Sequence, residues 1–216
     1  MMRPKLLLLD CDSTLSAIEG IDELARLRGS QVREQVVALT DRAMNGELPI
    51  NETFGRRLEL IRPDADACCK IAMRYLDRMA PNLVEALEQA RAAGWLPVVV
   101  SGGFVQVIGP LAQRLGIDRI EAVPLAFNPD GSYAGYDGHY PTTRNGGKAE
   151  LVRLLRDELQ PDKVVMVGDG VSDLETIDDV DLFIGFTGFV RRQAVVDRAK
   201  VLMDDFQQLS GLLESL

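Results

Sequence analysis

Histidine and cysteine, which build many nucleophilic and zinc sites, are scarce in this chain. Its one histidine, His139, lies in a stretch rich in Gly, Tyr and Pro and is predicted to be a loop residue. A Ser-His-Asp or Cys-His mechanism is therefore disfavoured. The three cysteines, Cys11, Cys68 and Cys69, have the spacing of neither a zinc site nor a disulfide framework. A reducing, cytoplasmic location is the expectation that follows.

Long apolar runs and an excess of positive charge are also missing. No apolar segment approaches the length of a membrane-spanning helix, and the segment before Asp10 is too short for a signal peptide. The net charge of −9 disfavours binding to nucleic acid. We therefore expect a small-molecule substrate, with no nucleic-acid or membrane partner, in a protein that is compatible with a homodimer. The 216 residues are enough for a core with an inserted subdomain.

Two aspartates follow the apolar run Leu6–Leu9, in the segment Asp10-Cys11-Asp12-Ser13-Thr14. The run predicts a buried strand of a parallel sheet. Residues two apart in an extended chain point to the same side, so Asp10 and Asp12 are expected to share one cleft. Two carboxylates there repel each other unless a cation or a proton offsets them. The pattern suggests a magnesium site with one aspartate as nucleophile and the other as acid and base. A turn or a helix cap is the plainer alternative.

The spacing of apolar residues divides the chain after the first strand into a helical part and a part in which helices and strands alternate. Helical spacing predicts helices over about 31–44, 51–61 and 64–79, and no strand is expected between Leu15 and Ala80. From Pro81 helices and strands alternate, with a turn at 128–131 that predicts a hairpin. Strands are predicted at about 96–100, 120–127, 163–167, 182–184 and 200–203. The expected fold is α/β: a three-layer, Rossmann-like parallel-sheet core (residues 1–15 and 80–216) with an inserted helical cap (residues 16–79) and a small β-hairpin.

Three later segments place polar residues where strands end or helices begin. Ser101-Gly102-Gly103 follows an apolar strand, and its hydroxyl and backbone donors suit a phosphate, although a plain glycine turn is an alternative. Lys148 follows two glycines at a helix start, where a lysine suits a phosphoryl oxygen or is an ordinary surface residue. Asp169 ends a strand, and Asp173 either joins it or caps a helix. Together these segments predict an aspartate-nucleophile phosphoryl-transfer site that binds Mg²⁺.

The ordered motifs DxDST, SGG, GGK and GDGxSD resemble the haloacid dehalogenase superfamily, in the phosphatase branch with an early helical cap. Further stretches, spread from about residue 6 to residue 206, are similar to its phosphoserine-hydrolysing members. They are 19–25, 42–46, 101–104, 133–136, 146–148 and 183–186. This resemblance implies magnesium-dependent hydrolysis of O-phospho-L-serine to L-serine and phosphate, the last step of serine biosynthesis. A related phosphatase, or transfer of phosphate to an alcohol such as homoserine, is the alternative.

The resemblance also implies roles for individual residues. It implies Asp10 as nucleophile, Asp12 as acid and base, and a metal held by Asp10, the backbone carbonyl of Asp12 and Asp169, with Asp173 supporting. The implied substrate-binding residues are Glu19, Met44, Arg57, Ser101, Gly102, Lys148 and Ser172.

Arg57 has support from the sequence itself. On a helical wheel it falls among Phe54, Leu58 and Ile61, whereas Arg56 points away. A charge on an apolar stripe is costly unless it meets an anion, which favours a substrate carboxylate. An arginine that extends its apolar stem over the stripe is the alternative.

Overall fold

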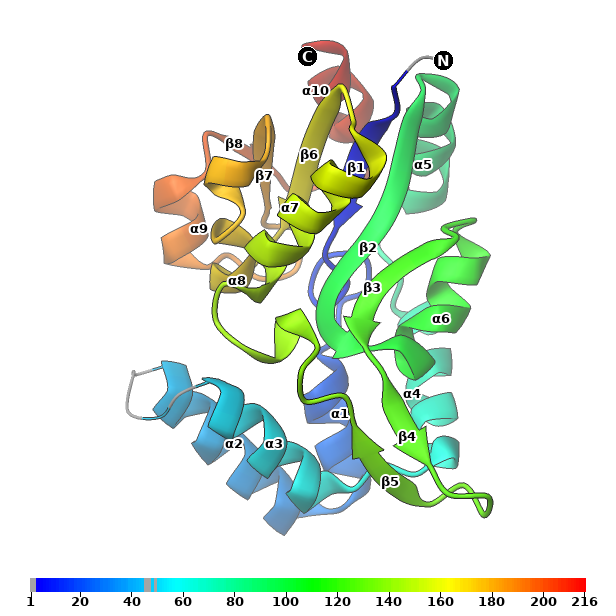
Figure 1. The fold of residues 1–216 in the computed structure, drawn as a ribbon, viewed down its shortest axis with the longest axis vertical. Coiled ribbons are helices and arrows are strands. Elements are labelled where there is room, and N and C mark those ends of the chain that lie inside the picture. Colours follow the sequence, from blue (N-terminus) through cyan, green and yellow to red (C-terminus); the bar gives the residue numbers. More distant parts are fainter. Residues whose placement is uncertain (1–2, 45–47, 49) are drawn as a thin grey trace.

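The computed structural model describes residues 3–44, 48 and 50–216 and has a central parallel sheet between helices (Figure 1). The strand order is β3-β2-β1-β6-β7-β8. The strands are β1 (Lys5–Leu9), β2 (Trp95–Phe104), β3 (Arg119–Val123), β6 (Lys163–Gly168), β7 (Leu182–Phe186) and β8 (Val201–Met203). From β1 the sheet grows through β2 and β3 on one side and through β6 to β8 on the other. The order therefore reverses between β1 and β6, where open α/β sheets bind ligands.

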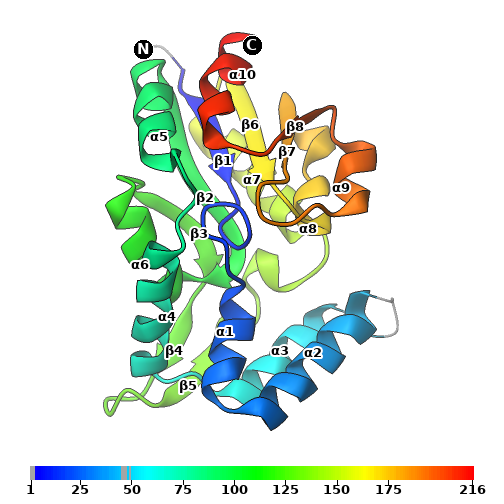
Figure 2. The same ribbon diagram turned by 180° about the vertical axis from the view of Figure 1, so that it is seen from behind.

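Both faces of the sheet are buried, which explains the unbroken apolar runs of its strands. Leu7 and Leu9 of β1 enter one hydrophobic cluster, whereas Leu6 and Leu8 enter another. Side chains alternate along a strand, so these clusters lie on opposite faces. Helices α7 (Gly147–Leu159), α8 (Val171–Leu174) and α9 (Gln193–Arg198) cover one face, and α5 (Leu83–Ala92), α6 (Val105–Arg114) and α10 (Leu209–Glu214) cover the other (Figures 1 and 2). The predicted three-layer α/β fold is confirmed.

Four helices are inserted between β1 and α5. They are α1 (Gly20–Leu27), α2 (Ser30–Met44), α3 (Ile50–Ile61) and α4 (Ala65–Asp77). As expected, the described residues between Leu15 and Ala80 contain no strand. Helices α2 and α3 lie side by side and project away from the sheet, whereas α4 packs along α6 (Figures 1 and 2). The carboxyl ends of β1 and β6 face this insertion. Within the described chain, no helix is long and apolar enough to cross a membrane.

The two connections between the insertion and the core run side by side. The Ala17 amide donates to the Arg78 carbonyl at 2.9 Å, and the Ala80 amide donates to the Leu15 carbonyl at 2.9 Å. The Ser16 hydroxyl donates to the carbonyl of Tyr75 at 3.2 Å. These bonds fix the base of the insertion next to the segment that carries Asp12.

The hairpin forms where the turn residues predict it, between β4 (Leu125–Phe127) and β5 (Tyr133–Tyr136). It packs against the insertion, because the Tyr136 ring lies 5.4 Å from that of Phe54 and the Ala65 amide donates to the Gly131 carbonyl at 2.9 Å. Three short 3-10 helices complete the described elements: η1 (Pro141–Thr143), η2 (Ile177–Asp179) and η3 (Phe206–Gln208).

Two strand predictions differ from the structure. The single strand expected at 120–127 is two, β3 and β4, which separate at Pro124, a residue that has no amide to donate to a neighbouring strand. The strand expected to end at Val100 continues as β2 to Phe104. Its pairing with β3 shifts between Val100 and Phe104, so the two glycines lie in an irregular strand end and not in a plain turn.

Candidate active site

Asp10 and Lys148 form a buried ion pair at the carboxyl end of β1. The side chain of Asp10 is 8% exposed and that of Lys148 is 4% exposed. The Lys148 ammonium donates to Oδ1 of Asp10 at 2.6 Å and to Oδ1 of Asp173 at 2.6 Å. Burial opposes the charged form of Lys148, but the two carboxylates outweigh it and hold its pKa above the ordinary value. A fixed positive charge therefore lies beside the Asp10 carboxylate.

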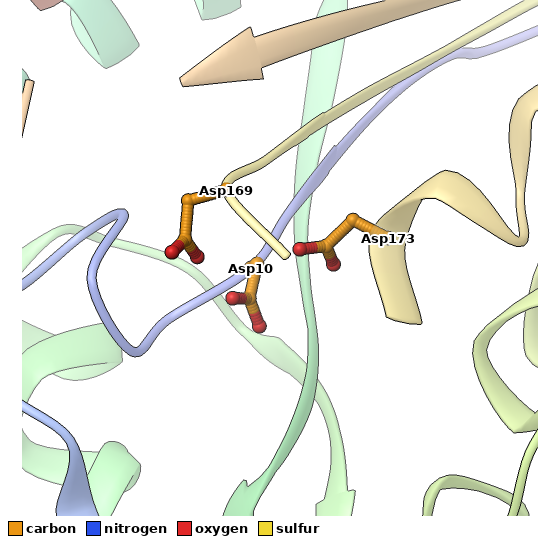
Figure 3. Close-up of side chains that lie close together, drawn as sticks. All are labelled: Asp10, Asp169 and Asp173. Carbon is orange, nitrogen blue, oxygen red and sulfur yellow. The ribbon is translucent and has the colours of Figure 1, made fainter. Parts of the chain in front are cut away.

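Asp10, Asp169 and Asp173 point toward one another from three different segments (Figure 3). Each offers an oxygen atom, and these atoms lie within 4.8 Å of one another. Burial raises the pKa of each carboxyl to about 6, and repulsion between the acids adds to this rise. A bound cation would offset the repulsion, and a cluster of carboxylates without Cys or His suits a hard cation. This cluster could hold a metal ion.

Asp12 lies in a curled loop and not in the extended segment that its spacing suggested. The amides of Leu15 and Ser16 both donate to the Cys11 carbonyl, at 2.9 and 3.1 Å, and Ser13 adopts a positive φ of 53°. In this loop both oxygens of Asp12 accept a hydrogen bond. Oδ2 accepts from the amide of Gly20 at 2.8 Å, and Oδ1 accepts from the hydroxyl of Tyr75 at 2.5 Å.

The surroundings of Asp12 favour its protonated form. Burial is the largest cause, and the charge of Glu19 adds to it, so that the pKa of Asp12 is well above its ordinary value. A raised pKa favours the protonated carboxyl, which is the form that serves as a general acid. Asp12 and Ser101 lie close together, because both border Gly103. A Cβ added to Gly103 would lie 3.6 Å from Oδ1 of Asp12 and 3.3 Å from Oγ of Ser101.

The residues predicted to bind phosphate come from the end of β2 and the start of α7. Ser101 is buried, and its hydroxyl oxygen accepts a hydrogen bond from the Gly103 amide at 3.0 Å. Gly102 lies beside η1, where an added Cβ would be 3.9 Å from the Thr142 carbonyl. Gly147 must be a glycine, because a Cβ there would collide with the carbonyl of Pro141. This close approach sets the start of α7 and therefore the position of Lys148.

Arg57 lies where the helical wheel places it, on the buried side of α3. Phe54, Leu58 and Ile61 are buried, whereas Arg56 is exposed and pairs with Glu52. The Nη1 of Arg57 donates to the Thr40 hydroxyl at 3.3 Å, and its guanidinium lies 5.8 Å from the Phe54 ring centre. Its buried Nε has no hydrogen-bond partner among the described residues. A guanidinium whose Nε is buried in this way suits an anionic ligand group.

Glu19 is the N-cap residue of α1 and faces the acidic cluster. Its Oε1 accepts hydrogen bonds from the Ser13 hydroxyl at 2.7 Å and from Nη2 of Arg192 at 3.2 Å. Its negative charge, like that of Asp22, acts on Arg57. Glu19 and Arg57 therefore supply opposite charges to the same region, as a zwitterionic ligand would require.

Two of the predicted substrate-binding residues lie at helix ends. Ser172 lies in the first turn of α8, next to Asp173, and is exposed. Met44 ends α2, and its side chain lies outside the described part of the structure.

Three residues near the acids were missed by sequence reasoning. Nε of Arg192 donates to Oδ2 of Asp169 at 2.9 Å, the hydroxyl of Thr14 donates to its Oδ1 at 3.4 Å, and Tyr75 donates to Asp12. Tyr75 stands among ordinary residues of α4, and Arg192 is the extended N-cap residue before α9, so no local pattern marked either of them. Thr14 belongs to the DxDST motif, but no role was predicted for it.

A family model described as haloacid dehalogenase-like hydrolase matches residues 7–178 of this chain. The chain belongs to this family. Its relatives among the haloacid dehalogenase-like hydrolases include the phosphoserine phosphatase of Mus musculus, which is 37% identical over 207 residues, covering 95% of this chain and 91% of the mouse protein.

Solved structures of the same family have closely similar folds. A substrate-bound phosphoserine phosphatase complex is 25% identical with a TM-score of 0.81, and the alignment covers 100% of both chains. A phosphoserine phosphatase bearing an analogue of the phospho-aspartyl intermediate is 25% identical with a TM-score of 0.80, covering 99% of both chains. The expected membership in the haloacid dehalogenase superfamily is confirmed.

Proposed function

We propose that this chain hydrolyses O-phospho-L-serine to L-serine and phosphate through an aspartyl-phosphate intermediate, the last step of serine biosynthesis. The observation that carries the proposal is the buried Asp10–Lys148 pair at the carboxyl end of β1, beside Asp169. A carboxylate held in this way suits nucleophilic attack on phosphorus. The mouse relative, named phosphoserine phosphatase, supports the substrate, and the phospho-aspartyl analogue in a related structure supports the intermediate.

We assign the core to residues 1–15 and 80–216 and the cap to residues 16–79. The hydrogen bonds between residues 15–17 and 78–80 support this boundary, because the chain passes there from the core into the cap and back again. A cytoplasmic location is part of the proposal and rests on three cysteines that are all free thiols.

The proposed reaction has two halves that share one acid–base residue. In the first, an oxygen of Asp10 bonds to phosphorus while the bond from phosphorus to the seryl oxygen breaks, and Asp12 gives that oxygen its proton. In the second, Asp12 takes a proton from a water molecule whose oxygen attacks phosphorus and releases Asp10. Lys148, Ser101 and the Gly102 amide would bind the phosphoryl oxygens and stabilise the charge that develops on them.

Magnesium is the metal that we propose. Asp10, Asp169 and the backbone carbonyl of Asp12 would hold it, with Asp173 supporting through its bond to Lys148. The donors fit, because all are oxygen atoms and the buried carboxyls carry raised pKa values that a cation would relieve. When bound, the ion would offset negative charge on the phosphoryl group.

The cap residues would give the site its preference for an amino acid. Glu19 would receive the substrate ammonium, and Nε of Arg57, which has no partner among the described residues, would bind the carboxylate. Met44 and Ser172 would complete the contacts, from the end of α2 and the start of α8.

The test is release of phosphate from O-phospho-L-serine with Mg²⁺, beside phosphothreonine, phosphoethanolamine and a panel of phosphosugars, with free serine quantified. Strong selectivity for phosphoserine with equal amounts of serine and phosphate is the expected result. Activity confined to another ester would contradict the Glu19 and Arg57 assignments and leave the reaction type intact. Phosphate recovered on an added alcohol such as homoserine would show a phosphotransferase instead.

A further inference from the structure

We propose that Tyr75 is a positioning residue that holds the Asp12 carboxyl in the orientation needed to protonate the leaving oxygen. The inference rests on the proposed function, because it assigns Asp12 the acid role given above. Tyr75 lies on α4, more than sixty residues along the chain from Asp12, and its hydroxyl donates to Oδ1 of Asp12 at 2.5 Å.

The two oxygens of Asp12 are fixed from two separate elements. Tyr75 holds Oδ1 from α4, and the Gly20 amide at the start of α1 holds Oδ2 at 2.8 Å. Rotation of the carboxyl group about its last side-chain bond would break both hydrogen bonds. A carboxylate has about four lone-pair sites, so two donors leave a site free for the proton that passes to the leaving oxygen of the substrate. The plane of the group is therefore set before the substrate binds.

Tyr75 is itself held in place. It is 1% exposed, and its backbone carbonyl accepts a hydrogen bond from the Ser16 hydroxyl at 3.2 Å. Helix α4 packs along α6 of the core, unlike the projecting α2 and α3 (Figure 2). The tyrosine thus belongs to the part of the insertion that is anchored to the core.

Gly20 makes room for this contact. A Cβ at Gly20 would collide with the Tyr75 hydroxyl, so the hydroxyl can reach Asp12 only past a residue without a side chain. The sequence pairs a glycine at position 20 with a tyrosine at position 75, and the two together orient Asp12.

Orientation of Asp12 matters most for a poor leaving group. The seryl alkoxide departs only with a proton from the general acid, whereas the oxide of an activated aryl phosphate departs without one. Loss of the Tyr75 hydroxyl should therefore slow phosphoryl transfer from an alkyl ester and spare transfer from an aryl ester. The quantity kcat/KM isolates this first half-reaction, because it excludes the later attack of water.

The experiment compares Tyr75→Phe with wild type by kcat/KM for phosphoserine and for p-nitrophenyl phosphate. We expect a loss of roughly tenfold for phosphoserine, below the 10²–10⁴-fold that a whole acid–base group contributes. The loss for the aryl ester should be less than twofold. Tyr133→Phe is the matched control, since Tyr133 is also buried and its hydroxyl has no hydrogen-bond partner among the described residues. It should leave both values unchanged.

Equal losses on both substrates would show a merely structural role, and no loss on phosphoserine would show that Asp12 needs no positioning; either result overturns the proposal. If Tyr75→Phe fails to fold, Gly20→Ala gives the same comparison, because it displaces the hydroxyl and retains the tyrosine. In the double mutant Gly20→Ala/Tyr75→Phe, the loss of kcat/KM that Gly20→Ala adds should be smaller than in the single mutant, because the Tyr75 hydroxyl is already absent. If the wild type hydrolyses another alkyl phosphate but not phosphoserine, only the proposed function is contradicted. Tyr75→Phe and wild type would then be compared on that alkyl phosphate and on p-nitrophenyl phosphate.

Discussion

Asp10 has the surroundings of a nucleophile, and its amide counterpart gives a direct test. Asp10→Asn retains shape but removes the attacking oxygen charge, so no covalent phosphoenzyme should form. The measurement is acid quenching during turnover followed by mass spectrometry of the peptide that contains position 10. Asp12→Asn is the comparison, because it should slow turnover roughly 10²–10⁴-fold while position 10 is still phosphorylated. A phosphorylated Asp10→Asn protein would assign the nucleophile to another residue.

Arg57 and Arg56 are neighbours with the same charge and opposite surroundings. The buried Nε of Arg57 has no hydrogen-bond partner among the described residues, whereas Arg56 is exposed and pairs with Glu52. Arg57→Ala should lower kcat/KM for phosphoserine by roughly 10- to 100-fold, the usual worth of a hydrogen bond to a charged group. Phosphoethanolamine, which has no carboxylate, should be affected far less.

Arg56→Ala is the control for this experiment, and it should leave both substrates unaffected. An equal loss on the two substrates in Arg57→Ala would mean that the arginine supports the cap and does not bind the carboxylate.

At the scale of helices and strands, the sequence predicted most of what forms. The strands at β1, β6, β7 and β8 were predicted because apolar runs bounded by polar residues are strong local signals. The extension of β2 past Val100 was not, because its glycines favour a turn locally, and only the pairing of Phe104 with Val123 of β3 returns the chain to the sheet. Arg192 and Tyr75 were missed for a related reason. Their partners are more than twenty and sixty residues away, and no local pattern encodes such a contact.

Helix α4 carries Tyr75, and its start depends on one side chain. Asp64 is the N-cap, since its Oδ1 accepts from the Ala67 amide at 2.7 Å, and its Oδ2 pairs with Arg28. Asp64→Ala should lower the free energy of unfolding by about 1 kcal/mol, the usual cost of losing such a cap. Asp64→Asn retains a capping oxygen and should lose much less. Urea unfolding of the three proteins at neutral pH measures the difference.

The pH dependence of the Asp64 contribution has a defined sign. The Ala67 amide, followed by Arg28, lowers the pKa of Asp64 in the folded protein. A carboxyl with a lowered folded pKa stabilises above its unfolded pKa of about 3.9 and loses that stabilisation as the pH falls through the folded value. The gap between wild type and Asp64→Ala should therefore be constant above about pH 5 and shrink in acid. A gap that widens in acid would contradict the capping role.

Across the whole molecule, the site is assembled from segments that meet only in the folded chain. Asp10 follows β1 and Asp169 follows β6, and these two strands pair in parallel at the point where the sheet order reverses. Asp173 comes from α8 and Lys148 from α7. The unfolded chain has no comparable cluster of carboxylates. A cation that binds this cluster therefore binds the folded state alone.

Metal binding should therefore raise the stability of the whole protein. A ligand present at about 100 times its dissociation constant stabilises a folded state by about 2.7 kcal/mol. For a chain of this length each kcal/mol shifts Tm by about 2–4 °C, so saturating Mg²⁺ should raise Tm by about 5–10 °C over the protein in EDTA. Asp169→Asn is the informative variant, because it retains the shape of the side chain and removes one of the three clustered carboxylates. Its Tm in EDTA should remain close to that of wild type, while the rise with Mg²⁺ should largely disappear. A wild-type Tm that does not respond to Mg²⁺ would contradict the metal site, and an equal rise in Asp169→Asn would place the metal elsewhere.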